Sequence, residues 1–315
     1  MPYFDKITVF APAKVNLHLA IKDKRPDGFH NLESIFLAVD FGDTLHFNST
    51  ENDNITEIVM EGLETPIPLE KNIIFKAINL FRNKTDFSQG VKVIVEKRIP
   101  PGGGLGGGSS NAASTLLSMN KIAGSPLNRE TLLEMAAQLG SDVPFFIHKT
   151  PAAWVTGRGE HIKPLKANKM PLVLVNPGFH SDTAAAFRLL DLDRSLKSSR
   201  GDVRTEGSKT LRTQREKKGI RYLNNSSALS APLCLCERSF ANYFNDFLDV
   251  FGDEERSTYN QIISQLKDLG AQYANLSGAG STCFGIFTEN EKVQEAVKTL
   301  NSKYKFVQLC YSHCE

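Results

Sequence analysis

A run of glycines in the first half of the sequence has the composition of a phosphate-binding loop. Six of the seven residues from 102 to 108 are glycine. Glycines allow successive backbone N–H groups to approach an anion, and a helix that begins after such a loop adds unpaired donors and the positive end of its dipole. We expect these unpaired N–H groups at residues 109–111. A flexible linker or a tight turn is the alternative for an isolated glycine run. The residues expected to bind a triphosphate are Pro101, Gly102, Gly103, Gly104, Leu105, Gly106, Gly107, Gly108, Ser109, Ser110 and Asn111.

The segments on either side of the glycine run indicate a strand, a loop and a helix. Valines alternate with other residues from 91 to 95, as in a strand, and apolar residues recur between 112 and 123 on one face of a helix. The run lacks the Gly-Lys-Ser/Thr ending of a Walker A loop, and it lacks the strand, glycine and acidic-residue layout of a dinucleotide site. The two common nucleotide-binding folds are therefore disfavoured.

Two more segments are suited to the same pocket. Near the N-terminus, Lys14 and Asn16 lie in an alternating apolar segment, so a strand would direct both side chains to one face. Near the C-terminus, residues 276–283 form a second run of small residues, which includes Gly278 and Gly280. We expect this second turn to close over the pocket that the glycine run forms.

Together with the glycine run, residues 12–16 and 276–281 resemble the three motifs of the GHMP kinase superfamily in order and spacing. The resemblance covers residues 7 to about 192 and 240 to 290. It implies an α+β fold of two domains, of which the N-terminal one is like part of a ribosomal protein and the C-terminal one is ferredoxin-like. The active site is then expected in the cleft between them.

Three segments, at 25–30, 106–111 and 139–146, are similar to one branch of that superfamily. This closer resemblance implies ATP-dependent phosphorylation of the 2-hydroxyl of 4-diphosphocytidyl-2-C-methylerythritol, a cytidine-diphosphate alcohol of the non-mevalonate route to isoprenoids. ATP is then the phosphoryl donor, and Mg²⁺ is expected to neutralise its β and γ oxygens. Two rival functions remain: another GHMP kinase, acting on homoserine or a mevalonate-type alcohol, and a non-catalytic RNA-binding module.

The resemblance assigns the chemistry to one carboxylate and one ammonium group. Asp142 occupies the position of the family's catalytic aspartate and is expected to accept the proton of the attacking hydroxyl. Lys14 is expected beside it, where a positive charge favours the carboxylate and lowers the cost of forming an alkoxide. Without the resemblance, Asp142 has the position of a helix N-cap, and Lys14 that of a surface lysine on an edge strand.

The resemblance also assigns residues to the cytidine-bearing substrate. Phe29 and His30 match an aromatic residue and a histidine that stack on cytosine and hydrogen-bond its edge. Phe187 is expected as the second wall, on the same helical face as Thr183. The alternatives are core packing for Phe29 and His30, and a bond that only ties strand to loop for Asn16. The full set of expected substrate-binding residues is Asn16, Phe29, His30, Thr183, Phe187, Gly278 and Gly280.

The ligands of the metal and of adenine are less well defined. Ser109 or Ser110 offers a hydroxyl to Mg²⁺, and no carboxylate other than Asp142 is suggested. Asn72 and Lys97 are named as candidates for adenine.

Local patterns predict further elements and a division into two domains. We expect strands around residues 8, 17, 45 and 93, a helix around 75, and strands at 152–155 and 172–175. A helix over 131–139 should end at Gly140 as a left-handed cap. The 315 residues, of which 41% are hydrophobic, suffice for two cores, and we divide the chain into 1–168 and 169–315.

Charge and cysteine content limit which partners and which compartment are expected. A formal net charge of +2 gives no reason to expect nucleic acid or a membrane as a partner, and no apolar stretch approaches the ~20 residues of a membrane span. Because the first motif begins close to Met1, we expect no targeting peptide and a cytoplasmic protein, as a monomer or weak homodimer. Five cysteines, an odd number, fit a reducing compartment. Plain thiols are expected for all of them rather than a zinc site at Cys310, His313 and Cys314.

One segment has a different composition from the rest. Residues 197–221 contain nine Lys or Arg and three Asp or Glu, so they carry +6 while the remainder of the chain carries −4. With almost no large apolar residues, the segment cannot bury enough surface to offset its ordering entropy. We expect a solvated, mobile insertion, and a polyanion-binding arm is the alternative.

Overall fold

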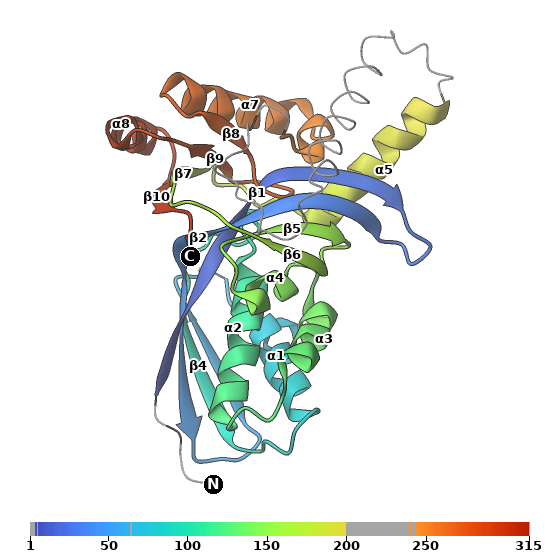
Figure 1. Cartoon of the computed structure of the whole chain (residues 1–315), viewed down its shortest axis with the longest axis vertical. Coiled ribbons are helices and arrows are strands. Elements are labelled where there is room, and N and C mark those ends of the chain that lie inside the picture. Colours follow the sequence, from blue (N-terminus) through green and yellow to red (C-terminus); the bar gives the residue numbers. More distant parts are fainter. Residues whose placement is uncertain (1–3, 5, 64, 200–239, 241–242, 315) are drawn as a thin grey trace.

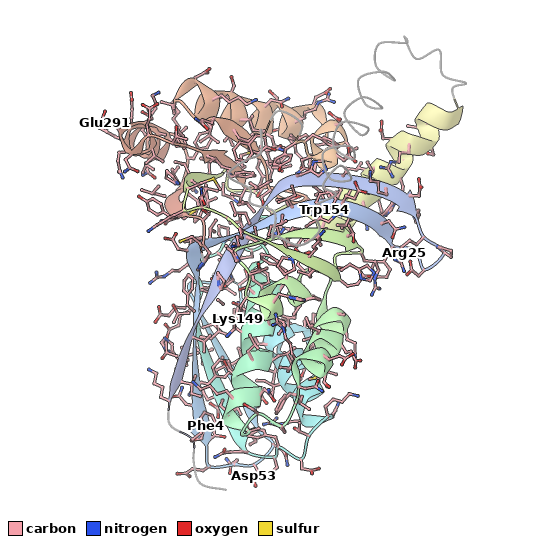
Figure 2. All side chains as sticks on the ribbon, in the orientation of Figure 1. Phe4, Arg25, Asp53, Lys149, Trp154 and Glu291 are labelled. Carbon is pink, nitrogen blue, oxygen red and sulfur yellow. The ribbon has the colours of Figure 1, made fainter. Side chains whose placement is uncertain are left out.

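The protein consists of two β-sheets, each covered by helices (Figures 1 and 2). Of the basic segment 197–221, only the backbone of 197–199 is described, as the end of a helix, and the remainder lies outside the described residues, as do Cys234 and Cys236. The computed structural model describes residues 4, 6–63, 65–199, 240 and 243–314.

The first sheet belongs to the N-terminal half of the chain. Its order is β3-β4-β2-β5-β6, and β1 pairs with β2 as a long antiparallel hairpin. The β3–β4 pair is parallel, and the pairs of β2 with β4 and β5 are antiparallel. The strands are β1 (Ile7–Lys24), β2 (His30–Thr50), β3 (Thr56–Glu61), β4 (Gly90–Glu96), β5 (Ala152–Gly157) and β6 (His161–Leu165).

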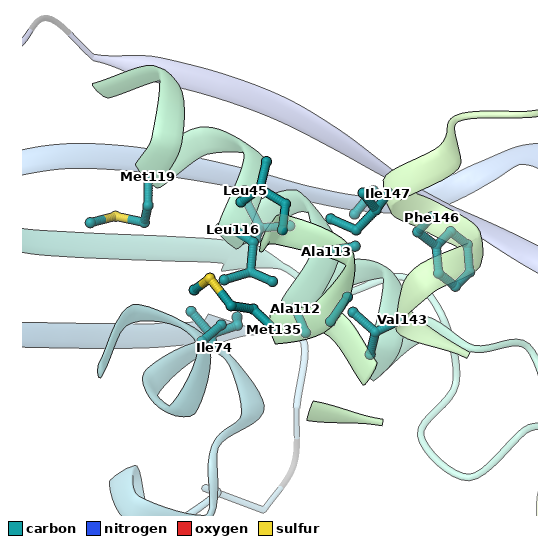
Figure 3. Close-up of a cluster of buried hydrophobic side chains, with 14 of the residues drawn as sticks. Leu45, Ile74, Ala112, Ala113, Leu116, Met119, Met135, Val143, Phe146 and Ile147 are labelled. Carbon is teal, nitrogen blue, oxygen red and sulfur yellow. The ribbon is translucent and has the colours of Figure 1, made fainter. Parts of the chain in front are cut away.

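Helix α2 lies at the centre of the N-terminal helices, which bury their apolar faces against this sheet (Figures 1 and 3). Ala112, Leu116 and Met119 are all buried, as the period of 112–123 predicted. The small side chain of Ala112 also leaves room for Val143 at the start of α4. The helices are α1 (Ile73–Arg82), α2 (Gly107–Ile122), α3 (Arg129–Leu139) and α4 (Val143–His148), with a short 3₁₀ turn at Leu69–Lys71.

The second sheet has the order β10-β7-β9-β8, and all three of its pairs are antiparallel. With helices between β7 and β8 and between β9 and β10, this is the ferredoxin-like arrangement that the family resemblance implied. Its strands are β7 (Pro171–Asn176), β8 (Tyr273–Leu276), β9 (Cys283–Ile286) and β10 (Phe306–Tyr311). Its helices are α5 (Thr183–Ser199), α7 (Asp253–Asp268) and α8 (Asn290–Asn301), with a 3₁₀ turn at Asp246–Asp249.

A shared apolar core joins the two sheets. Successive side chains of β7 point to opposite faces, as in any strand. Val173 and Val175 pack under the C-terminal helices, whereas Leu172 and Leu174 pack in a cluster that also contains Val15 of β1. The strand is therefore buried on both faces, which explains its unbroken apolar run. The division at residues 168 and 169 falls between the two sheets and stays a prediction.

Two local expectations were wrong. Gly140 follows α3 but has φ 169° and ψ 158°, which is extended backbone and not a left-handed cap. Helix α2 begins at Gly107, with Gly106 as its N-cap at φ 70°, so its first turn lies inside the glycine run and not at 109–111. Packing of α2 against the sheet and neighbouring helices outweighs the low helix propensity of glycine, so the helix begins inside the glycine run.

Candidate active site

A cleft of about 510 Å³ lies where the three predicted motifs meet. It is bounded by segments that are up to about 260 residues apart in the sequence. Of the described residues expected in the site, Phe29, His30, Ser110 and Gly280 are not among its lining residues. The predicted residues that line it are Lys14, Asn16, residues 101–109, Asn111, Asp142, Thr183, Phe187 and Gly278.

The carbonyl groups of the glycine loop are turned toward the protein. The carbonyl oxygen of Gly102 accepts the Ser181 N–H at 3.3 Å, and that of Leu105 accepts the Lys14 N–H at 3.0 Å. The carbonyl of Gly104 accepts the hydroxyl of Ser277 at 2.8 Å. Gly104 has φ 74°, and a Cβ there would overlap the Ser277 carbonyl oxygen. Only glycine therefore allows this close approach, and the bonded carbonyls do not oppose an anion in the cleft.

The start of α2 supplies the donors that an anion needs. Because α2 begins at Gly107, the N–H groups of residues 107–109 have no partner within the helix, and the positive end of the helix dipole lies there. A Cβ on Gly107 would lie 3.2 Å from Nζ of Lys97, so an ammonium group adjoins the loop. The described lining residues include three lysines and one carboxylate, Asp142. This excess of positive charge suits a polyphosphate.

Lys14 and Asp142 form the predicted pair. Lys14 Nζ lies 3.4 Å from Oδ2 of Asp142 and 2.6 Å from Oδ1 of Asn16, and it lies 4.8 Å from the centre of the Phe36 ring. The side chain of Lys14 is 5% exposed, whereas that of Asp142 is 28% exposed. The ammonium is thus fixed inside the wall of the cleft, while the carboxylate can reach a ligand.

Asp142 is at the N-cap position of α4, yet its side chain makes no capping hydrogen bond within the described chain. The alternative of a purely capping aspartate is therefore wrong. Its backbone is in the helical region, at φ −87° and ψ −12°, which turns the side chain away from the N–H groups of the first turn. The carboxylate is left to Lys14 and to the cleft.

Asn16 joins the first motif to the third. Its Oδ1 accepts from Lys14, its Nδ2 donates to Ser34 Oγ at 2.9 Å, and its backbone N–H donates to Ser277 Oγ at 3.3 Å. Ser277 Oγ in turn donates to the carbonyl of Gly104. Both side-chain bonds of Asn16 therefore lie within β1 and β2, and the bond that ties strand to loop comes from its backbone N–H. Asn16 still lines the cleft, as does Gly278.

His30 stacks on Phe187, which lines the cleft. Their rings stack with centroids 5.2 Å apart and an angle of 17°. His30 Nε2 lies 2.7 Å from Asp191 Oδ1, one turn after Phe187 on α5, and Lys24 Nζ lies 2.5 Å from Asp191 Oδ2. Burial raises the pKa of Asp191, but the hydrogen bonds from Lys24 and His30 outweigh it and lower the pKa overall. An ionised Asp191 therefore fixes the orientation of the His30 ring.

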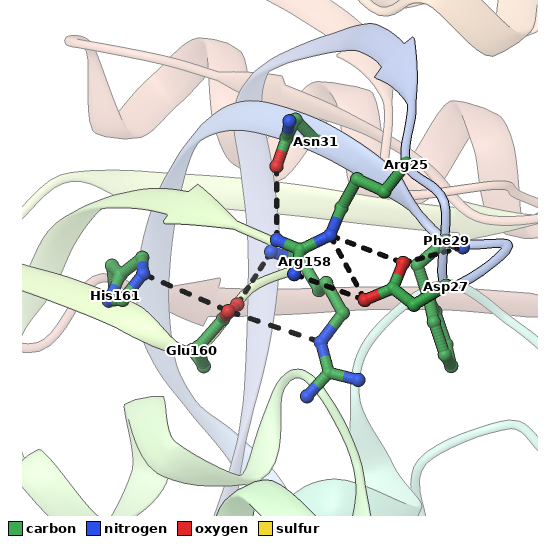
Figure 4. A network of polar contacts seen from close by, with 7 residues as sticks. All are labelled: Arg25, Asp27, Phe29, Asn31, Arg158, Glu160 and His161. Carbon is green, nitrogen blue, oxygen red and sulfur yellow. Dashed lines mark hydrogen bonds and ion pairs between the residues drawn. The ribbon is translucent and has the colours of Figure 1, made fainter.

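Phe29 lies on the β1–β2 turn, outside the cleft (Figure 4). Phe29 is 50% exposed, and the guanidinium of Arg158 lies 4.8 Å from the centre of its ring. Asp27 Oδ1 accepts the Phe29 N–H at 3.2 Å, which holds the turn. A Cβ on Gly159 would lie 2.9 Å from the carbonyl oxygen of Ser141, so the turn that carries Arg158 packs directly beside the segment of Asp142.

The two adenine candidates have structural partners as well. Asn72 Oδ1 caps α1 by accepting the Ile74 N–H at 3.0 Å, and Asn72 lines the cleft. Lys97 also lines the cleft and forms an ion pair of 2.8 Å with Asp43.

Sequence reasoning missed four residues that support the site: Asp43, Asp191, Arg158 and Ser277. Ser277 lies inside the predicted second turn, and a charged Asp43 in an apolar strand was a signal that a buried carboxylate needs partners. Asp191 and Arg158 gave no such signal, because their partners are more than 100 residues away in the sequence.

The remaining expectations concern metals and membranes. Cys310 is buried and Cys314 is exposed, both as free thiols. Among residues whose structure is described, no group of three or more His, Cys, Asp or Glu side chains is arranged to hold a metal ion. In the same residues, no helix is both long and apolar enough to cross a bilayer.

Known proteins similar to this chain decide its family. Residues 72–150 match the model of the GHMP kinases N terminal domain, and residues 234–305 match that of the GHMP kinases C terminal domain. A 4-diphosphocytidyl-2-C-methyl-D-erythritol kinase of Thermodesulfovibrio yellowstonii is 37% identical over 293 residues, which are 93% of either chain. The chain belongs to the 4-diphosphocytidyl-2-C-methyl-D-erythritol kinase family. Another member of this family, from Desulfotalea psychrophila, is 32% identical and covers 93% of this chain and 91% of its own.

Solved structures agree with membership of this kinase family. A crystal structure of a 4-(cytidine 5'-diphospho)-2C-methyl-D-erythritol kinase has a TM-score of 0.71 at 25% identity and covers 98% of this chain and 100% of its own. A homoserine kinase from Cytophaga hutchinsonii has a TM-score of 0.66 at 17% identity, over 100% and 96% of the two chains, and shows the shared fold alone. The predicted superfamily, the predicted branch and the α+β fold are confirmed.

Proposed function

We propose that the protein transfers the γ-phosphoryl group of ATP to the 2-hydroxyl of 4-diphosphocytidyl-2-C-methyl-D-erythritol, in the non-mevalonate route to isoprenoid precursors. The products are the 2-phosphate and ADP. The observation that carries this proposal is the Lys14–Asp142 pair, 3.4 Å apart, in a cleft with a glycine loop on one wall and Phe187 on another. Membership of the kinase family supports the choice of substrate.

The geometry supports a direct transfer with Asp142 as the base. The carboxylate takes the proton of the 2-hydroxyl while that oxygen attacks the γ-phosphorus, and the bond to the bridging oxygen breaks so that ADP leaves with the electron pair. The Lys14 ammonium lowers the cost of the negative charge that develops on the attacking oxygen. The N–H groups of residues 107–109 bind the β and γ phosphates. Lys97 and Asn72 lie in the same cleft and are assigned to the nucleotide.

Mg²⁺ supplies charge neutralisation on the phosphate oxygens when it is bound. The described part of the cleft contains one carboxylate, which is compatible with a metal that takes most of its ligands from ATP and water. Ser109 lines the cleft, and a Cβ on Gly140 would lie 4.0 Å from its hydroxyl oxygen. Ser109 and Asp142 therefore come from adjoining segments and are the residues that would hold the metal.

The cytidine end of the substrate is assigned to His30 and Phe187, and Thr183 lines the cleft one turn before Phe187 on α5. Phe29 lies outside the cleft, so its contact with cytosine stays a prediction. Because Phe187 lines the cleft and His30 stacks on it, Phe187 offers cytosine a stacking surface and His30 offers a polar edge. His30 is oriented for this by Asp191. Gly278 borders the substrate, and Gly280 keeps the shape of the second turn that carries it.

A coupled assay of ADP release with several alcohols tests the proposal. The cytidine-diphosphate alcohol should support turnover, and homoserine and mevalonate should not, because neither has a base to stack on Phe187. Asp142→Asn, purified in parallel, controls for a contaminating kinase. Release of ADP with homoserine or mevalonate at the same rate, or no release with the cytidine alcohol, would refute the assignment. Binding of RNA without any turnover would support the RNA-binding alternative instead.

A further inference from the structure

Asp43 is a fully buried carboxylate of β2 with four hydrogen-bond donors. Its Oδ1 accepts the backbone N–H groups of Arg98 and Ile99, both at 2.8 Å. Its Oδ2 accepts Nζ of Lys97 at 2.8 Å and Nδ2 of Asn111 at 3.0 Å. One oxygen therefore binds main chain only, and the other binds side chains only.

The four donors come from both ends of the glycine loop. Arg98 and Ile99 lie directly after β4, where the chain leaves the sheet toward the loop. Asn111 lies near the start of α2, where the chain leaves the loop. Asp43 does not border the described cleft, so it acts from behind the loop. A single carboxylate thus holds the two ends of the loop at a fixed separation.

Lys97 and Asn111 both line the cleft and are both oriented by Asp43. Lys97 donates to Asp43 and to the Ile99 carbonyl at 2.5 Å, and among the described residues these are its hydrogen bonds, so one of its three N–H donors is left for a ligand. A carboxylate only accepts, so Nδ2 of Asn111 must face it. Burial lowers the pKa of Lys97, and Asp43 opposes this shift.

We propose that Asp43 is a positioning residue for ATP, which holds the Lys97 ammonium and both ends of the glycine loop in the arrangement that binds the phosphates. This inference rests on the proposed function, because it takes ATP as the ligand of the loop. The competing explanation is an ion pair that stabilises the fold and has no effect on the nucleotide.

Asp43→Asn separates the main-chain contacts of residue 43 from its side-chain contacts. The amide oxygen can still accept from Arg98 and Ile99, but the NH₂ group would face the donors of Lys97 and Asn111. We expect the dissociation constant of MgATP to rise about tenfold or more, from the loss of hydrogen bonds to charged groups. Turnover at saturating ATP should stay within about threefold of wild type, because the Lys14–Asp142 pair is not touched.

Asp40→Asn is the matched control. Asp40 lies three residues earlier on the same strand, is exposed, accepts the Tyr311 N–H at 2.6 Å, and is not among the described residues that line the cleft. Its substitution should leave the affinity for MgATP unchanged. The same affinity loss in both variants would overturn the proposal, as would a folded Asp43→Asn protein with wild-type affinity for MgATP.

A second comparison decides the matter if Asp43→Asn does not fold. Lys97→Met and the double variant Asp43→Asn with Lys97→Met remove one charge and both charges, and the neutral double variant avoids an unpaired buried ion. If Asp43 and Lys97 serve ATP binding, Lys97→Met should bind MgATP at least about tenfold more weakly than wild type, and the double variant no more tightly than Lys97→Met. Wild-type affinity for MgATP in the folded double variant would overturn the proposal.

Calorimetric titration with MgATP, without an alcohol acceptor, keeps this test distinct from that of the proposed function. A wild-type protein that binds MgATP but phosphorylates no cytidine-diphosphate alcohol refutes the assigned substrate and leaves the Asp43 comparison valid. A wild-type protein that does not bind MgATP refutes both.

Discussion

Replacement of Lys14 by methionine removes the charge beside Asp142 with little change of shape. The methylene groups of Lys14 lie in the wall of the cleft, where its side chain is only 5% exposed, and methionine can fill that space. The side-chain amide of Asn16 loses its contact with Nζ but keeps its bond to Ser34, and the backbone N–H of Asn16 keeps its bond to Ser277. We therefore expect a folded protein with altered chemistry.

The structure gives the expected loss of turnover in Lys14→Met. At 3.4 Å and an effective dielectric constant of about 20, Coulomb's law gives about 5 kcal/mol for the attraction between Lys14 and Asp142. The carboxylate is 28% exposed, so water screens part of this energy. If about 3 kcal/mol acts on the charge that develops in the transition state, turnover falls by about two orders of magnitude.

Single-turnover measurement of phosphoryl transfer at saturating ATP and alcohol is the appropriate assay, because product release cannot mask the chemical step. Lys22→Met is the control, since Lys22 lies on the same strand in an ion pair of 3.1 Å with Glu33 and does not line the described cleft. Turnover within about tenfold of wild type in folded Lys14→Met would remove Lys14 from the mechanism.

Asp142→Asn should bind ATP nearly as well as wild type and lose about two to four orders of magnitude in turnover, and retention of a tenth of the activity would exclude it as the base. Phe187→Ala should weaken the cytidine alcohol by about 1 to 3 kcal/mol with ATP affinity unchanged, whereas equal losses in two titrations would indicate a folding defect. Gly106→Val should impair ATP binding, because Gly106 has φ 70° and a Cβ there would lie 3.0 Å from Cγ of Lys14; normal ATP affinity by calorimetry would contradict the phosphate-cradle assignment. Burial and the nearby charge of Lys22 lower the pKa of His18 from 6.5 to about 4, so its contribution to the free energy of unfolding should be complete above pH 6.5 and fall by about 3 kcal/mol as the pH decreases from 6.5 to 4. Urea titrations at pH 7 and pH 4 should show this loss in wild type and not in His18→Phe, and an equal loss in both would assign it to other groups.

Local sequence patterns predicted most of the elements of the fold. Strand alternation, helical periodicity and the three motifs predicted β1, β4, β7, α1, α2 and α5, and the order of those motifs indicated the superfamily before any contact was known. These features are readable because side-chain periodicity follows from the geometry of each element and requires no distant partner.

The ends of the helices were predicted less accurately. The start of α2 was placed after the glycines, and Gly140 was expected in a left-handed conformation. In both cases the backbone follows tertiary contacts: α2 is held by the packing of its buried face, and Gly140 leads the chain into the turn that presents Asp142. Intrinsic preferences of single residues are too small to resist such packing.

By itself, the sequence predicted that a glycine loop, a lysine, an aspartate and aromatic residues belong to one site, and the family resemblance supplied the roles proposed for them. Only the tertiary structure decided how each is held. Asp142 meets Lys14 across more than 120 residues, Asp191 orients His30 across 161, and Asp43 joins both ends of the loop from a different strand. Such partners come together because buried charges and hydrogen-bonding groups must be satisfied wherever the packed sheets bring them, and no local pattern encodes that meeting.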